Sequence, residues 1–188
     1  MNNNLSDGRK LKLIALIGLS GSGKTSVGQQ LSQSIKLNFI DTDKLIEEKE
    51  KKIIPEIFLN HGEKYFRQLE TQVLAEISLN PNFLIVATGA GLPCYNNNFD
   101  KLAKCSYLIY LKTNIDTLIK RLTGDGIANR PLLSNKTPES LNSILLQMLE
   151  EREKFYSQAD IIIDTDKLSL ADIAFNIQRK FLADVIWY

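Results

Sequence analysis

The chain has 188 residues, of which 44% are apolar and 24% are charged, the composition of an ordinary globular protein. Its formal net charge of +1 predicts no nucleic-acid or membrane partner, so any anion must be bound locally. Cys94 and Cys105 are too few for a disulfide framework, and His61 is the only histidine available to a Ser-His-Asp mechanism. We expect a cytoplasmic monomer forming one domain over residues 1–188, with residues 1–10 disordered.

Five short apolar runs predict the strands of a sheet. They are near-continuous rather than alternating, which indicates strands covered on both faces. They lie at residues 13–17, 38–40, 83–87, 107–111 and 161–163. Apolar stripes with helical spacing lie between them, and two pairs resemble capping boxes, Thr113 with Asp116 and Ser169 with Asp172. This alternation predicts an α/β fold in three layers, with a central five-stranded parallel sheet flanked by helices.

Two segments do not fit the simple alternation of strands and helices. Residues 43–79 form a long, mostly helical stretch without a strand, and residues 123–136 are polar and marked by glycine and proline. We interpret both segments as excursions from the core.

The most specific motif is GLSGSGKT at residues 18–25, which fits the P-loop pattern G-x-x-x-x-G-K-[ST] between a predicted strand and a predicted helix. Its glycines allow backbone N–H groups to surround a phosphate, and the helix that follows adds its positive dipole end. Lys24 can reach the terminal phosphates, and the Thr25 hydroxyl can ligate Mg²⁺. The motif therefore predicts a P-loop NTPase fold that binds a nucleoside triphosphate with magnesium.

Several absences favour a small-molecule kinase over other P-loop proteins. The chain has no N-K-x-D motif of guanine-specific GTPases, and none of its apolar runs leads into the Asp-Glu pair of motor ATPases. Asp41 and Asp43 follow the second predicted strand, at the sheet edge where ligands bind. One carboxylate could hold a metal-bound water, and the other could accept a hydrogen bond from an attacking alcohol. The alternative, that the aspartate directly before KLIEEKE, Asp43, merely caps a helix, stays open.

Three arginines and one turn of small residues complete the candidate site residues. Arginine suits bidentate capture of carboxylate or phosphate, although a surface ion pair is the ordinary role for any one of them. The arginines are Arg67 in YFRQLE, Arg130 in NRPLL and Arg152 in EEREKFY. The turn TGAG at residues 88–91 follows the third predicted strand and allows close approach of a ligand to the backbone.

Taken together, the motifs GLSGSGKT, DTDKLIE, GEKYFRQLE, TGAG and RPLL followed by REKFY resemble the shikimate kinase family over nearly the whole chain. The resemblance implies ATP and shikimate as substrates, with Mg²⁺. ATP phosphates would be bound by Gly21, Ser22, Gly23, Lys24, Thr25, Ser26 and, from a lid at residues 123–136, Arg130. Thr25 and Asp41 would hold the metal. Asp43 would contact the shikimate hydroxyls, and the acid would be held by Arg67, Gly89, Ala90, Gly91 and Arg152. Lys24, Asp43 and Arg130 would be catalytic, and residues 43–79 would form the substrate-binding region.

The chain also departs from the family pattern. Ala90 replaces the middle of three glycines and would carry strain if its φ were positive. Lys154 stands where the family tends to have proline, and Thr123 stands about where it often has a further arginine. Arg121 lies nearby, but we do not assign it that role.

Two alternative functions remain at this stage. One is another kinase of the same architecture, for gluconate or adenylylsulfate. The other is an ATP-binding regulatory module that has lost its substrate.

Overall fold

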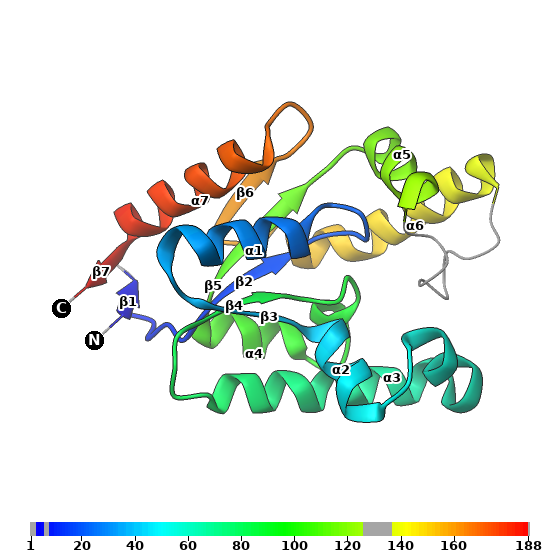
Figure 1. Ribbon diagram of the computed structural model, residues 1–188, viewed down its shortest axis with the longest axis horizontal. Coiled ribbons are helices and arrows are strands. Elements are labelled where there is room, and N and C mark those ends of the chain that lie inside the picture. Colours follow the sequence, from blue (N-terminus) through cyan, green and yellow to red (C-terminus); the bar gives the residue numbers. More distant parts are fainter. Residues whose placement is uncertain (1–2, 6–7, 126–136, 188) are drawn as a thin grey trace.

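The computed structural model describes residues 3–5, 8–125 and 137–187, and the predicted lid with Arg130 lies largely outside these ranges. A five-stranded parallel sheet, in the order β3-β4-β2-β5-β6, forms its centre (Figure 1). The strands are β2 (Leu13–Ile17), β3 (Asn38–Asp41), β4 (Leu84–Ala87), β5 (Ser106–Lys112) and β6 (Ile161–Asp164). All five predicted strands are confirmed, with ends that differ by at most one residue.

Helices cover both faces of the sheet. On one face lie α1 (Lys24–Ile35) and α7 (Leu170–Asp184), and on the other lie α3 (Ile54–Leu79) and α4 (Asn98–Cys105) (Figure 1). The remaining elements are α2 (Thr42–Glu50), the short 3₁₀ helix η1 (Leu92–Cys94), α5 (Ile115–Asp125) and α6 (Pro138–Tyr156). None of the described helices combines the length and apolar character needed to cross a bilayer.

Burial of the strands follows their position in the sheet. Every residue of the central strand β2 is buried, because it has neighbours on both sides and helices on both faces. The edge strand β6 alternates instead, with Ile162 and Asp164 exposed, and the other edge strand, β3, is only partly covered. The prediction from the continuous apolar runs, that the strands are covered on both faces, is therefore correct for the inner strands. It overestimates the burial of the two edge strands.

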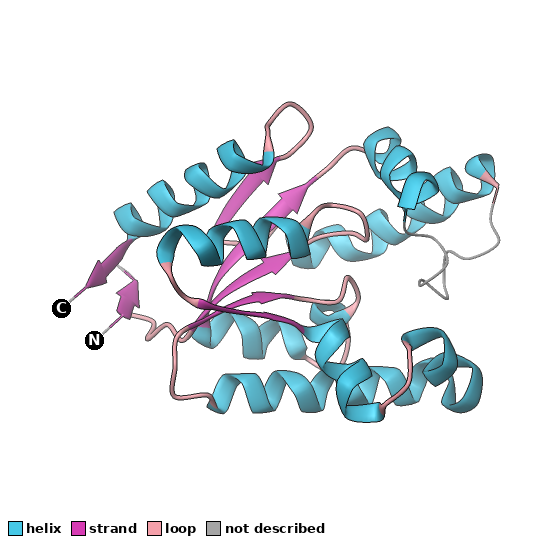
Figure 2. Ribbon diagram, in the orientation of Figure 1, coloured by secondary structure: helices cyan, strands magenta, loops and turns pink. Residues whose placement is uncertain are grey.

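The strand order places a topological switch at β2. The chain leaves β2, forms β3 two positions away, returns to β4 beside β2, and then adds β5 on the opposite side. In open parallel sheets, ligands bind at the carboxyl ends of the strands near such a switch. Figure 2 shows the loops that follow β2, β4, β5 and β6 gathered along this one edge.

Two local predictions differ from the structure. Helix α5 is capped by Asn114, whose Oδ1 accepts from Thr117 N at 2.8 Å, because the Thr113 hydroxyl is buried against Thr165 at 2.6 Å. The capping box predicted at Thr113 is therefore wrong, whereas the one at Ser169 is confirmed. Residues Asn3–Leu5 form a strand, β1, rather than a disordered start, because they pair in antiparallel register with β7 (Val185–Trp187).

Candidate active site

The loop between β2 and α1 forms a phosphate-sized cradle of backbone N–H groups. Gly23 caps α1 with φ +93°, in the left-handed region that glycine enters without a steric cost. Among the described residues, no side chain caps this helix end. The first N–H groups of α1 are therefore left for an anion, which the helix dipole also favours.

Lys24 points back into this loop rather than out to solvent. Its Nζ donates to the carbonyl oxygens of Gly18 and Leu19, both at 2.9 Å, and the residue is buried. The ammonium is thereby held inside the cradle formed by the loop, as the motif predicts for a phosphate-binding lysine.

Asp41 connects the loop to the next strand. Its Oδ2 accepts from the Thr25 hydroxyl at 2.7 Å, and its Oδ1 accepts from the backbone N–H of Asp43 at 3.0 Å and of Lys44 at 3.4 Å. Asp41 is thus the N-cap of α2, so the helix-capping alternative considered for Asp43 is wrong by two residues. The oxygen that faces Thr25 also fits Mg²⁺, which is held in such sites by one or two side-chain oxygens together with phosphate and water.

Asp43 and the buried Glu70 both flank Gly89. A Cβ placed on Gly89 would lie 2.5 Å from Asp43 Oδ1 and 3.0 Å from Glu70 Oε1, so a larger residue here would require the two carboxylates to shift. Burial raises the pKa of the Glu70 carboxyl to about 7 against the lowering effect of Arg67, and the nearby charge of Asp43 raises it further. The glycine at this position therefore brings two carboxylates against the backbone that follows β4.

Arg67 is buried between carboxylates. Its Nε and Nη2 donate to Glu63 Oε1 at 3.1 and 2.8 Å, and its Nη1 donates to Glu70 Oε2 at 2.8 Å. Burial disfavours the charged guanidinium, but Glu70 outweighs this effect and raises the pKa of Arg67 above its usual value. A Cβ on Gly91 would lie 2.3 Å from Arg67 Nη1, so this guanidinium lies directly against the turn that follows β4.

Arg152 reaches the same region from α6 and is also buried. Burial raises the pKa of the Cys94 thiol to about 11, and the positive charges of Arg152 and Arg67 partly oppose this rise. Tyr156, one turn after Arg152 on α6, donates from its hydroxyl to the carbonyl of Ala90 at 2.5 Å. Two buried cations from different helices therefore converge on residues 89–94.

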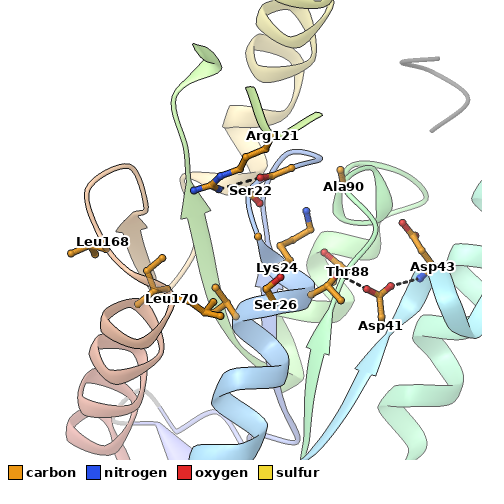
Figure 3. Close-up of a pocket in the computed structure, with 15 residues that line it drawn as sticks. Ser22, Lys24, Ser26, Asp41, Asp43, Thr88, Ala90, Arg121, Leu168 and Leu170 are labelled. Carbon is orange, nitrogen blue, oxygen red and sulfur yellow. Dashed lines mark hydrogen bonds between the residues drawn. The ribbon is translucent and has the colours of Figure 1, made fainter. Parts of the chain in front are cut away.

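A cleft of about 510 Å³ opens over the phosphate loop (Figure 3). Asp41 and Asp43 stand on one side of Lys24, and Leu168 and Leu170 stand on the other (Figure 3). The apolar side, which Ile173 completes, has the character expected around a nucleotide base.

Arg121 is a cleft residue to which the sequence analysis assigned no role. Its Nη1 donates to Gly21 O at 3.2 Å, and it lies 3.9 Å from where a Cβ on Gly23 would stand. Thr123, by contrast, turns its hydroxyl back to the carbonyl of Ile119 at 2.8 Å on its own helix. Arg121 is on α5, which lies beside the phosphate loop. The phosphate-loop motif by itself gave no indication of this neighbour.

The structure brings together most of the predicted site residues. Those that line the cleft are Gly21, Ser22, Gly23, Lys24, Thr25, Ser26, Asp41, Asp43 and Ala90. The residues that do not line it are Arg67, Gly89, Gly91 and Arg152, of which Gly89 and Gly91 belong to the turn after β4 and Arg67 lies against Gly91. Arg130 lies outside the described residues. Ala90 is absent from the described residues with positive φ, so the strain considered for it does not arise.

A P-loop at the switch point, a pair of carboxylates and two buried arginines define a small-molecule kinase of the P-loop class. Comparison with known proteins narrows this class. The family model for shikimate kinase matches residues 20–181. A shikimate kinase from Azobacteroides pseudotrichonymphae genomovar. CFP2 is 37% identical over 170 residues, covering 90% of this chain and 99% of that protein. The chain therefore belongs to the shikimate kinase family.

Solved structures agree with this assignment. A shikimate kinase from Acinetobacter baumannii in complex with shikimate has a TM-score of 0.84 at 34% identity, covering 92% of this chain and 94% of that one. A gluconokinase from Sinorhizobium meliloti has a TM-score of 0.57 at 17% identity, covering 93% and 94%. The second likeness shows only a shared fold, so nothing favours the gluconate alternative over shikimate.

Proposed function

We propose that this protein transfers the γ-phosphate of ATP to the 3-hydroxyl of shikimate, giving shikimate 3-phosphate and ADP. The observation that carries the proposal is the crowding of charged side chains around the turn after β4, where Arg67 lies against Gly91 and Asp43 lies against Gly89. The buried Arg152 is on the same helix as Tyr156, one turn before this residue that binds the carbonyl of Ala90. An acid that also bears hydroxyl groups matches two cations and a carboxylate in this arrangement.

ATP would be bound by residues 21–26, with its base against the apolar side of the cleft. Lys24 would shift its ammonium from the carbonyls of the loop to the transferring phosphate, and Arg121 would add a second positive charge at the cleft. Thr25 and Asp41 would hold Mg²⁺, which supplies charge neutralisation at the phosphates when bound. Arg130 remains the predicted lid residue.

The acceptor would lie between Asp43 and the arginines. Asp43 would accept a hydrogen bond from the 3-hydroxyl and receive its proton as the oxygen attacks phosphorus. Arg67 and Arg152 would hold the carboxylate, and backbone groups of residues 89–91 would lie alongside. Catalysis in such a site depends on positioning and charge neutralisation more than on covalent chemistry.

The test is release of ADP from Mg·ATP by purified protein, with shikimate and gluconate in parallel. We expect release that depends on shikimate, with no response to gluconate. Release of ADP with gluconate but not with shikimate would show that the proposed substrate is wrong. ATP binding without turnover would favour the regulatory module instead. Cytoplasmic location and a monomeric state stay predictions of the sequence, and light scattering coupled to size exclusion would test the second.

A further inference from the structure

The guanidinium of Arg67 donates hydrogen bonds to two carboxylates, and its Cζ atom lies over two aromatic rings. Glu63 and Glu70 use three of its five N–H donors. One donor each on Nη1 and Nη2 remains for a substrate carboxylate. The Cζ atom lies 4.2 Å from the ring centroid of Tyr95 and 5.4 Å from that of Phe66. Tyr95 is therefore the closer of the two rings.

The hydrogen bonds alone hold the guanidinium unequally. The side chain of Glu63 is 45% exposed, and its Oε1 alone accepts the hydrogen bonds from both Nε and Nη2 of Arg67. Water therefore competes for this contact. Glu70 is fully buried but holds only Nη1. A guanidinium held firmly at one nitrogen can still tilt about that bond. The ring of Tyr95, packed over the guanidinium, restricts this tilt.

The loop that carries Tyr95 is fastened to the helix that carries Arg67. Asn96 Nδ2 donates to the Arg67 carbonyl at 3.1 Å and to the Thr71 hydroxyl at 3.0 Å. Asn96 and Asn97 have φ of +53° and +55°, a left-handed conformation that asparagine tolerates better than most residues. These two residues turn the chain after η1, so that Tyr95 lies over Arg67. The loop thus fixes the ring relative to the guanidinium through a separate set of contacts.

We propose that Tyr95 is a positioning residue of the acceptor site, which holds the plane of the Arg67 guanidinium ready for the substrate carboxylate. Bidentate binding of a carboxylate requires the two planes to align, so a tilt of the guanidinium weakens it. Tyr95 lies in LPCYNN, outside every motif used above, and it is 36% exposed at the surface. The inference rests on the proposed function, because it assigns the carboxylate of shikimate to Arg67.

The test compares Tyr95→Leu with Tyr95→Phe in steady-state kinetics for both substrates. Leucine keeps apolar bulk but removes the π face, whereas phenylalanine keeps the face. We expect Tyr95→Leu to raise the KM for shikimate by about three- to thirtyfold, the range of a cation–π contact, with kcat and the KM for ATP within about twofold. Tyr95→Phe should restore the KM for shikimate to near the wild-type value. Phe175→Leu, on the exposed face of α7, is the matched control and should change neither KM.

Three outcomes overturn the inference. They are an unchanged KM for shikimate in Tyr95→Leu, an equal rise in both KM values, and a Tyr95→Phe variant as impaired as the leucine variant. If Tyr95→Leu does not fold, Tyr95→Ala is measured by the same criteria. Wild-type protein that releases no ADP with shikimate refutes the proposed function itself. That failure is distinct, because it appears before any variant is compared.

Discussion

The nucleotide half and the acid half of the site are built in different ways. The proposed nucleotide half is one continuous loop, residues 18–25, whose backbone N–H groups and single lysine would bind the phosphates. The proposed acid half is assembled from side chains of α2, α3 and α6 around the turn after β4, and its Arg67 is already paired with Glu63 and Glu70. A local motif therefore specifies the first half, whereas the second half exists only once the chain has folded.

The largest effect should come from the nucleotide half, because one residue carries its main charge. We expect Lys24→Ala to abolish measurable turnover, a loss of about a thousandfold or more, since no other side chain of the loop places a cation at the transferring phosphate. Steady-state ADP release would measure it. Lys180→Ala, an exposed lysine of α7, is the control and should keep full activity. Retained activity in Lys24→Ala would contradict the role of the loop.

The acid half should respond to mutation selectively. We expect Arg67→Ala to raise the KM for shikimate by roughly a hundredfold while the KM for ATP changes little, because it removes one of two cations and leaves Glu70 buried without its partner. Arg67→Lys keeps the charge but loses the planar fork, so it should fall in between. An equal loss on both substrates would count against a division of the site into two halves.

The paired charges of the acid half also predict a pH dependence of stability. The pKa of Glu70 is raised to about 7 in the folded protein, mainly by burial, while Arg67 and Arg152 lower it and Asp43 raises it. A carboxyl whose pKa is raised on folding stabilises the protein fully below its unfolded pKa and loses that contribution as pH rises through 7. The free energy of unfolding should therefore fall between about pH 4.5 and 7, by up to about 3 kcal/mol.

Denaturant unfolding of wild type and Glu70→Gln at pH 5 and pH 8 would measure this fall. Glutamine does not ionise, so the variant should lose this part of the pH dependence. An identical pH dependence in both proteins would show that Glu70 is not the group responsible.

The smallest effect should come from Ala90, where the two halves meet. Its φ is not positive and its carbonyl is already engaged by Tyr156, so Ala90→Gly relieves no strain. We expect kinetic constants within about twofold of wild type and a free energy of unfolding lower by about 0.5 to 1 kcal/mol, from the greater freedom of glycine in the unfolded chain. Kinetics and denaturant unfolding check both values. A large gain in activity would mean that the methyl group obstructs the site.

The same contrast explains how much could be predicted from the sequence. The inner strands and the phosphate loop follow from contiguous patterns, and each was placed within one or two residues. Tyr95 was missed and Arg121 was given no role because their contacts are with residues far away in the sequence, which no local pattern encodes. Glu70 lies only three residues after Arg67 on the same helix, so its spacing could have indicated the ion pair, whereas its burial depends on the fold. Helix α4 was missed as well, and the cap of α5 was misplaced by one residue because burial of Thr113 decided it.

Asp41 belongs to both halves at once. One of its oxygens takes the hydroxyl of Thr25 in the nucleotide half, and the other holds the first turn of α2, which carries Asp43 to the acceptor. An N-cap of this kind contributes about 1 kcal/mol to its helix. If nucleotide binding moves the Asp41 carboxylate, it therefore also acts on α2, the helix that carries Asp43. By reciprocity, the order of α2 feeds back on the affinity for the nucleotide.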